Sequence, residues 1–157
     1  MSDIFKIYID RLTKERMEKI AFSSDCSFLD IHEAELQFAD PIDVKGEAYL
    51  TKEHLIIHLK IHTAASLLCK ICNGPACKEI ILDNFYHAEP LENIKRGIYD
   101  YSVKLREAVL LEVPAFLECN NGNCPQRTEL KEYFTENTMQ ASKKESRHFP
   151  FKNLQQE

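Results

Sequence analysis

The segment from His54 to His62 mostly alternates apolar and polar side chains, with Ile56 as the exception, and it constrains the fold more than any other part of the chain. Its apolar residues occupy the odd positions: Leu55, Ile57, Leu59 and Ile61. A period of two residues is typical of a half-buried β-strand. The even positions carry three histidines, His54, His58 and His62, at four-residue intervals. Residues four apart on a strand are separated by roughly 13 Å, and a zinc–nitrogen bond measures only about 2 Å. These histidines therefore cannot share one ion, and we expect them on the solvated face of the strand.

A second alternating segment precedes the first and predicts a hairpin. Val44, Gly46, Ala48 and Leu50 lie on one side of a strand if the period is again two. The polar sequence Thr51-Lys52-Glu53 separates the two segments and predicts a turn. Two such strands joined by a short turn pair in the antiparallel direction, with their apolar faces on the same side.

The remaining segments predict both strands and helices. We expect further strands at Ile4–Ile9, from Phe28 or Ile31 to Ala39, and at Lys78–Tyr86. We expect a short helix that Asp10 caps, with Leu12, Met17, Ile20 and Ala21 as its apolar positions. We also expect a helical turn after Pro90 that carries Leu91, Ile94 and Ile98, and a short helix at Thr128–Thr135. The chain is therefore expected to form one α+β domain over residues 1–136, with an antiparallel sheet and a few helices. A polar tail follows at 137–157.

The segment from Asp100 to Pro114 fits two periods. Its apolar residues satisfy the alternation of a strand and also the spacing of a helix. Alanine, leucine, arginine and glutamate favour the helix, and Pro114 supplies a stop signal. We expect a helix.

The role of the six cysteines depends on the cellular compartment, because disulfides form in some compartments and not in others. The N-terminal residues lack the basic and then apolar pattern of a signal peptide, and the apolar runs are too short to span a membrane. We therefore expect a cytoplasmic protein. Disulfides seldom persist in the cytoplasm, so the cysteines indicate metal binding or redox chemistry before they indicate cross-links.

Two close pairs of cysteines predict a metal site. Cys69 and Cys72 form a CxxC motif, and Cys119 and Cys124 enclose Asn-Asn-Gly-Asn. Tight turns of this kind direct backbone amides at sulfur and bring two thiolates close together. Four thiolates around Zn²⁺ make a closed structural site. Since the two pairs are far apart in the sequence, the fold must bring the two turns together, and the ion would then contribute to stability.

Other interpretations of the cysteines stay open. Cys69 and Cys72 can instead form a redox pair, although such a pair usually lies at the start of a helix that follows a parallel strand. Cys77 is a lesser candidate ligand, and His87 can replace one thiolate. Cys26 stands alone, which favours a small buried apolar side chain.

Several classes of activity lack support in the sequence. Glycine is scarce, with four in the chain, and no glycine-rich phosphate-binding loop is present. Neither a GxSxG nor an HExxH motif occurs, and a four-sulfur zinc site has no open position for water. We expect a protein that is not an enzyme and that takes no small-molecule substrate.

A series of segments carries a family resemblance over nearly the whole chain. These segments are Leu68–Cys72, Leu105–Glu107, Leu111–Pro114, Cys119, Gly122–Pro125 and Pro150–Leu154. Their order and spacing resemble the YceD family of bacterial proteins that support accumulation of large-subunit ribosomal RNA. Arg127 stands where many members carry a further cysteine. The resemblance implies a cytoplasmic ribosome-biogenesis factor without enzymatic activity.

The partner implied by this resemblance is a component of ribosome assembly, either a ribosomal protein or ribosomal RNA. The net charge of −5 favours a protein, or RNA bound only through a local patch. In the tail, Phe149, Pro150, Phe151 and Leu154 form a PFxxL segment that we expect to dock on a partner. The alternative function is a thiol-redox or metal-handling protein that uses Cys69 and Cys72.

Overall fold

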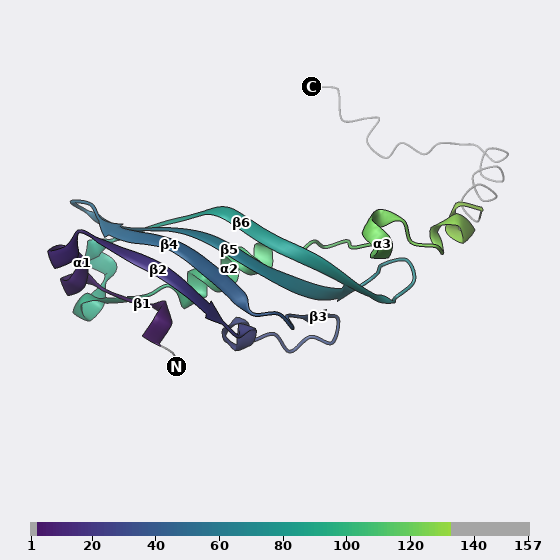
Figure 1. Ribbon diagram of the computed structural model, residues 1–157, viewed down its shortest axis with the longest axis horizontal. Coiled ribbons are helices and arrows are strands. Elements are labelled where there is room, and N and C mark those ends of the chain that lie inside the picture. Colours follow the sequence, from purple (N-terminus) through teal and green to yellow (C-terminus); the bar gives the residue numbers. More distant parts are fainter. Residues whose placement is uncertain (1–2, 133–157) are drawn as a thin grey trace, which may run out of the picture.

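The computed structural model describes residues 3–132 and has an antiparallel α+β architecture (Figure 1). The larger sheet consists of β2 (Met17–Ser24), β3 (Leu36–Gln37), β4 (Ile42–Leu50), β5 (His54–Leu68) and β6 (Pro75–Pro90). A second sheet pairs β1 (Lys6–Tyr8) with β7 (Ile98–Asp100). The helical elements are η1 (Asp3–Phe5), α1 (Ile9–Glu15), η2 (Cys26–Leu29), η3 (Leu91–Asn93), η4 (Lys95–Gly97), α2 (Ser102–Leu111) and α3 (Cys119–Gly122), and residues 127–132 are also helical. The predicted fold class is confirmed.

Strand β5 is the centre of the larger sheet. It pairs with β6 along one edge, and with β4 and then β3 along the other edge. All of these pairings are antiparallel, and β2 extends the sheet beyond β4. Strands β5 and β6 continue past the end of β4 and form an arm at one end of the molecule, where the short strand β3 also pairs with β5 (Figure 1).

The predicted hairpin between β4 and β5 is confirmed. Leu50 pairs with Leu55, and the Thr51 backbone N–H donates to the carbonyl oxygen of His54 at 2.8 Å. At the middle of this pair the two backbones approach closely. A Cβ atom on Gly46 would lie 2.1 Å from the carbonyl oxygen of His58, which explains why only glycine fits there.

The two faces of β5 have the predicted environments. The odd-numbered residues Leu55, Ile57, Leu59 and Ile61 are at most 1% exposed. His58 and His62 lie on the opposite face and hydrogen-bond to β6, at 2.7 Å to Asn84 and 2.6 Å to Glu79.

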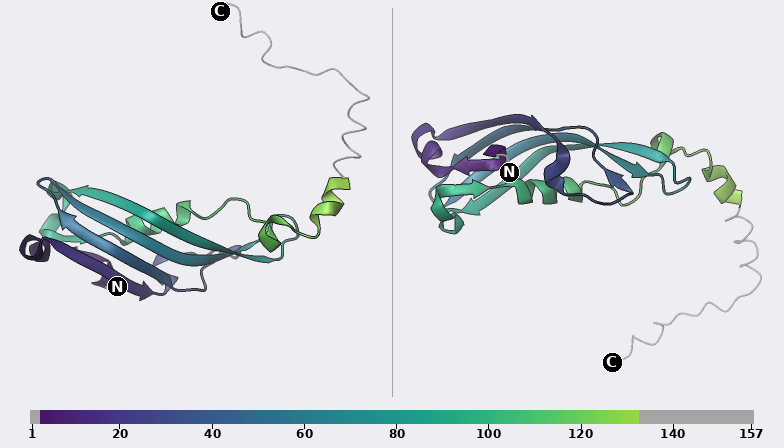
Figure 2. Two further views of the ribbon diagram at one scale, coloured as in Figure 1. Left: turned by 45° about the horizontal axis from the view of Figure 1, so that its top comes forward. Right: turned by 90° about the horizontal axis from the view of Figure 1, so that it is seen from below.

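The main core lies between the buried face of the larger sheet and the elements that cover it. Helix α2 and the β1–β7 pair lie against this face (Figure 2). Helix α2 contributes Leu105 and Val109, both fully buried. Tyr101 precedes the helix, is 1% exposed, and donates its hydroxyl to the carbonyl oxygen of Ile4 at 3.2 Å. The helix predicted between Asp100 and Pro114 is therefore present, and it closes the core.

The helix predicted from Asp10 is wrong in part. The helix that begins near Asp10 ends at Glu15, because Arg16 adopts a left-handed conformation with φ of 64° and its N–H caps the helix. Met17, Ile20 and Ala21, expected on that helix, belong to β2. The period of two in Ile20 and Phe22 fits the pairing with β4, and this tertiary pairing overrides the helical spacing.

The strand expected from Phe28 or Ile31 to Ala39 shrinks to Leu36–Gln37. Strand β4 already occupies the same edge of β5 from Leu55 to His62, so β3 can pair only with the part of β5 beyond His62, and it does so at Ser66 and Leu67. The expected strand at Ile4–Ile9 is likewise shortened to Lys6–Tyr8, whereas β6 extends beyond the expected Lys78–Tyr86. Helical turns follow Pro90 as predicted, although Ile98 already lies in β7.

Candidate metal centre

The first cysteine turn is the connection between β5 and β6. The backbone N–H of Cys69 donates to the carbonyl oxygen of Gly74 at 2.8 Å, so the hairpin closes across the CxxC motif. Inside the turn, the N–H of Ile71 points at the sulfur of Cys69, and the N–H of Gly74 points at the sulfur of Cys72, both at 3.4 Å. Asn73 has a φ of 56°, a left-handed conformation that asparagine tolerates better than most residues. The turn thus offers two sulfurs whose negative charge is stabilised by backbone donors.

The second cysteine turn is α3 and its continuation to Cys124. Asn120, Asn121 and Gly122 are consecutive left-handed residues, with φ of 53°, 52° and 86°. The N–H of Asn123 donates to the carbonyl oxygen of Asn120 at 3.1 Å. The Asn-Asn-Gly sequence suits this conformation, since asparagine and glycine adopt positive φ at the lowest cost.

The fold brings the two turns together, as predicted. Cys72 and Cys119 are 47 positions apart in the sequence, yet their sulfurs lie 3.7 Å from each other. The Lys70 N–H donates to the carbonyl oxygen of Leu117 at 2.9 Å, which links the two turns through the main chain. All four sulfur atoms, those of Cys69, Cys72, Cys119 and Cys124, lie within 4.8 Å of one another. Sulfurs at the corners of a zinc tetrahedron with bonds of about 2.3 Å are about 3.8 Å apart, so this cluster can hold a metal ion.

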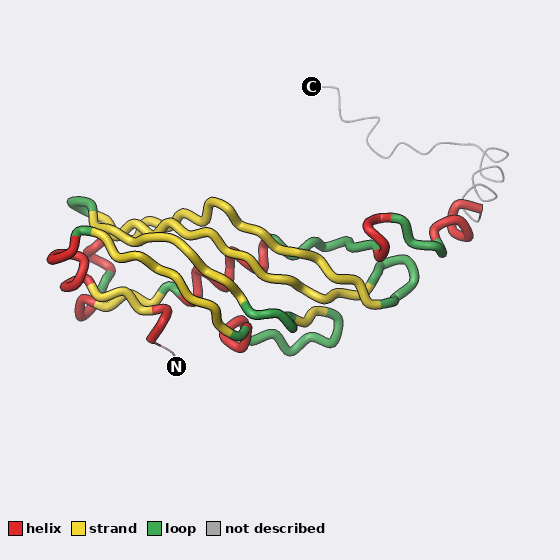
Figure 3. Tube along the Cα trace, in the orientation of Figure 1, coloured by secondary structure: helices red, strands yellow, loops and turns green. Residues whose placement is uncertain are grey.

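The cluster lies at the tip of the β5–β6 arm, where loops and turns replace regular strands (Figure 3). Cys69 is fully buried and Cys124 is 4% exposed, whereas Cys72 and Cys119 are partly exposed. Ala76, Ile71 and Leu117 pack against the sulfurs and form a small apolar cluster with them. This cluster is separate from the main core.

The thiols have opposite tendencies to ionise. Burial opposes ionisation of Cys69, but N–H donors of Cys119, Cys72 and Ile71 outweigh it and lower the pKa of this thiol to about 6. The hydrogen bond with Cys124, followed by burial, raises the pKa of Cys119 to about 12. Burial also raises the pKa of Cys124. The four sulfurs thus favour one thiolate among thiols, because hydrogen bonds stabilise a charge on Cys69, whereas the hydrogen bond with Cys124 and burial oppose a charge on Cys119, and burial opposes one on Cys124. A bound cation compensates the cost of burying further charge and favours deprotonation of all four.

A buried carboxylate beside the cluster was not recognised from the sequence. The Oε1 atom of Glu118 accepts from the backbone N–H of Cys124 at 2.9 Å and from Nε of Arg127 at 2.8 Å. Its Oε2 atom accepts from Nη2 of Arg127. The hydrogen bond from Arg127, followed by that from the Cys124 N–H, lowers the pKa of Glu118 to about 2. The only local signal was a glutamate directly before the second cysteine turn.

The two other cysteines lie outside the cluster. Cys77 is exposed on β6, opposite Ser66, and the cluster of potential ligands in residues 3–132 does not include it. Cys26 packs at the edge of the main core, as a small apolar side chain would, and donates to the carbonyl oxygen of Asp40 at 3.3 Å. Burial raises the pKa of Cys26.

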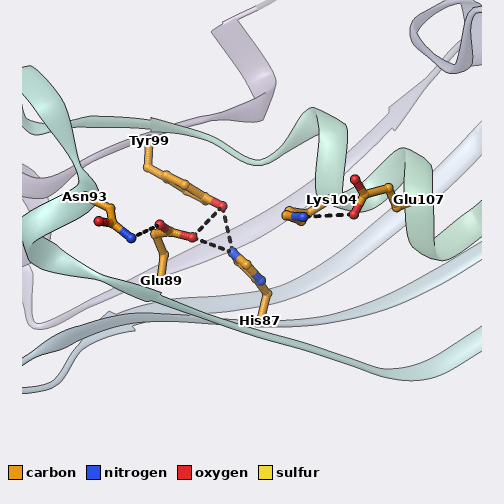
Figure 4. Close-up of polar contacts among 6 residues, drawn as sticks. All are labelled: His87, Glu89, Asn93, Tyr99, Lys104 and Glu107. Carbon is orange, nitrogen blue, oxygen red and sulfur yellow. Dashed lines mark hydrogen bonds and ion pairs between the residues drawn. The ribbon is translucent and has the colours of Figure 1, made fainter.

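His87 belongs to a different polar cluster (Figure 4). Its Nε2 atom lies 2.6 Å from the hydroxyl of Tyr99 and 3.3 Å from a carboxylate oxygen of Glu89. Asn93 donates to the other oxygen of Glu89 at 3.0 Å. Burial, reinforced by the charge of Glu89, raises the pKa of Tyr99 to about 12. Tyr99 and Glu89 therefore hold the His87 ring, and His87 does not replace a thiolate.

The expected PFxxL segment, Phe149, Pro150, Phe151 and Leu154, lies outside the described residues, as does the boundary expected at residue 136. In residues 3–132, no helix combines the length and apolar character needed to cross a membrane. Comparisons with family models, with curated proteins and with solved structures found no match to this chain.

Proposed function

We propose that Cys69, Cys72, Cys119 and Cys124 bind one Zn²⁺ ion as a structural centre. The observation that carries this proposal is the approach of two distant turns until four sulfurs lie within 4.8 Å of one another. Four sulfur donors with backbone N–H groups directed at them suit zinc and leave no ligand position for water. The ion would fasten the tip of the β5–β6 arm to the segment that follows α2.

The metal is tested by the zinc content of the full chain purified without added metal. We expect one zinc per chain, and we expect thiol reagents to modify the four clustered cysteines only after a chelator is added. A protein that lacks bound metal, with four freely reacting thiols, would contradict the proposal.

We propose further that the protein acts in the cytoplasm as a ribosome-biogenesis factor without enzymatic activity. It would support accumulation of large-subunit ribosomal RNA by binding a ribosomal protein or the RNA itself. This proposal is supported by the resemblance to the YceD family in the order of the cysteine, Leu-Arg-Glu and PFxxL segments. The zinc centre gives such a factor a rigid end on which a partner can dock.

Deletion of the gene in the cells that produce the protein tests this role. We expect the ratio of large-subunit to small-subunit ribosomal RNA to fall, and a copy of the wild-type gene to restore it. Affinity purification with and without nuclease then separates the two kinds of partner. Ribosomal proteins that remain after nuclease treatment indicate a protein partner, whereas an unchanged RNA ratio in the deleted cells would contradict the role.

The alternative is a thiol-redox or metal-handling protein that uses Cys69 and Cys72. The lowered pKa of Cys69, about 6, favours this alternative because thiolates are the reactive form. The complete burial of Cys69 opposes it, since a redox partner must reach the sulfur. Rapid alkylation of Cys69 in the metal-loaded chain would favour the alternative over a structural zinc centre.

A further inference from the structure

A buried negative charge lies next to the four sulfurs. The side chain of Glu118 is only 4% exposed, and it directly precedes Cys119. A carboxylate is costly to bury unless it is fully paired. This one also adds negative charge beside a centre that already carries four thiolates when a metal is bound. Its presence calls for a role that an apolar residue cannot fill.

The contacts of Glu118 connect both ends of the second cysteine turn. At one end, the carboxylate belongs to the residue before Cys119. At the other end, it accepts the backbone N–H of Cys124 at 2.9 Å. Arg127 binds both carboxylate oxygens and, through its own N–H, donates to the carbonyl oxygen of Cys124 at 3.0 Å. The pair thus encloses the turn in a ring of hydrogen bonds.

The second turn needs such support more than the first. The turn at Cys69 and Cys72 is closed by the pairing of β5 with β6. The turn at Cys119 and Cys124 has no paired strands on either side, and it contains three consecutive left-handed residues, Asn120, Asn121 and Gly122. Even for asparagine, left-handed backbone at two consecutive positions persists only where its surroundings hold it in place.

We propose that Glu118 is a positioning residue of the metal centre and that Arg127 is its anchor. Together they hold Cys119 and Cys124 at the spacing of two ligands before an ion binds, and the guanidinium compensates the charge of the carboxylate. Groups that orient metal ligands in this way commonly change metal affinity by 10-fold to 100-fold when they are removed. The inference rests on the proposed zinc centre and is independent of the ribosomal role.

Competition between the full-length protein and a chelator for zinc tests the inference. Glu118→Gln keeps the size of the side chain and removes its charge, and Arg127→Ala removes the anchor. We expect each change to weaken zinc binding by about 10-fold to 100-fold. Arg127→Lys keeps the charge but loses the two-pronged geometry, so we expect an intermediate loss. The matched control is Glu107→Gln, which removes an exposed carboxylate paired with Lys104 at 2.9 Å. It should leave zinc affinity unchanged.

Two further readouts separate positioning from a general loss of structure. With Co²⁺ in place of zinc, Glu118→Gln should still give the absorption of a tetrahedral four-sulfur site once the metal is in excess, because all four ligands remain. In metal-free Glu118→Gln, amide exchange should be faster than in the metal-free wild type at residues 118–127 and unchanged in β5 and α2. Faster exchange throughout the chain would overturn the inference in favour of a merely structural pair.

The outcomes also separate this inference from the function proposed above. Unchanged zinc affinity in both Glu118→Gln and Arg127→Ala would overturn the positioning role and leave the zinc centre intact. A wild-type protein that fails to bind zinc would overturn both. Normal accumulation of ribosomal RNA in deleted cells would overturn the ribosomal role and leave the positioning role intact.

Discussion

The two ends of the molecule are stabilised by different means. At the helix-covered end, where α2 and the β1–β7 pair lie on the larger sheet, sixteen buried residues of the described chain form one apolar core. At the cysteine end, the tip of the β5–β6 arm and α3, the corresponding cluster contains three buried residues, two of them cysteines. So small a cluster gains little from apolar burial. The comparison indicates that hydrophobic packing stabilises the first end, whereas the second has little apolar burial and would depend on the proposed metal.

The largest expected effect is the loss of the metal from a variant that keeps only one cysteine of each turn. Cys72→Ser combined with Cys119→Ser leaves two ligands, too few for a closed site. We expect no bound zinc, and fast amide exchange at residues 69–76 and 117–127. The helix-covered end should keep its slow exchange, since its core does not include these residues. Faster exchange at the helix-covered end as well would refute the separation between the two ends, and wild-type zinc content in this variant would refute the four-sulfur site.

The second prediction concerns the helix-covered end. Leu105 is fully buried on α2, so Leu105→Ala leaves a cavity and should lower the free energy of unfolding by about 2–5 kcal/mol. Denaturant titration followed by circular dichroism measures this change. Zinc affinity should stay as in the wild type, provided that the protein remains folded. If zinc affinity fell in parallel, the two ends would not be independent.

The sequence carried much of the information about both ends, but in different forms. The alternation in Leu55 to Ile61 predicted a strand and its buried face because burial repeats every two residues on any strand. That Met17 and Ile20 lie in a strand was not predictable in the same way. Their spacing fits a helix, and only the presence of β4 as a pairing partner decides for a strand.

At the cysteine end, the sequence predicts the candidate ligands but not the residues that hold them. Each cysteine pair was visible as a local motif, and the chemistry of four thiolates predicted that the pairs meet. The contribution of Glu118 and Arg127 was not predictable, because they are nine positions apart in a segment without a regular period. The exclusion of Cys77 follows from the register of β6, which leaves this side chain exposed, and no local pattern indicates that register.

The third prediction uses the close approach of β4 and β5 at the helix-covered end. Gly46→Ala adds a Cβ atom that would lie 2.1 Å from the backbone oxygen of His58 and 2.8 Å from Cα of Leu59. Neither backbone atom can move without separating the two strands. We expect a loss of about 1–3 kcal/mol in the free energy of unfolding, measured as above. Ala48→Gly on the same strand provides a comparison in which atoms are removed and not added.

The fourth prediction concerns alkaline pH and the cluster in Figure 4. The pKa of Tyr99 is raised, first by burial and then by Glu89, from 10.0 to about 12. The folded state therefore holds this proton more tightly than the unfolded state. The resulting contribution to stability is complete below about pH 10 and is lost as the pH rises toward 12.

Absorbance of the tyrosinate ion during an alkaline titration measures this effect. We expect Tyr99→Phe to remove a late-ionising group and to weaken the dependence of stability on pH in this range. The variant also removes a hydrogen bond to His87, which should cost about 0.5–1.5 kcal/mol at neutral pH. A variant that loses absorbance near pH 10 and not near pH 12 would show that Tyr99 ionises with the exposed tyrosines.

The last prediction is that substitution of Cys77 has no effect, and it tests which residues belong to the cysteine end. Cys77 is only five positions from Cys72, close enough in sequence for the two to serve the same ion. However, β6 has already begun at Pro75, and the pairing of Cys77 with Ser66 fixes it in the strand with its side chain exposed. Cys77→Ser should therefore leave zinc content, zinc affinity and the free energy of unfolding unchanged. A fall in zinc content would mean that β6 opens locally to exchange one sulfur for another, and the cysteine end would then extend into the strand.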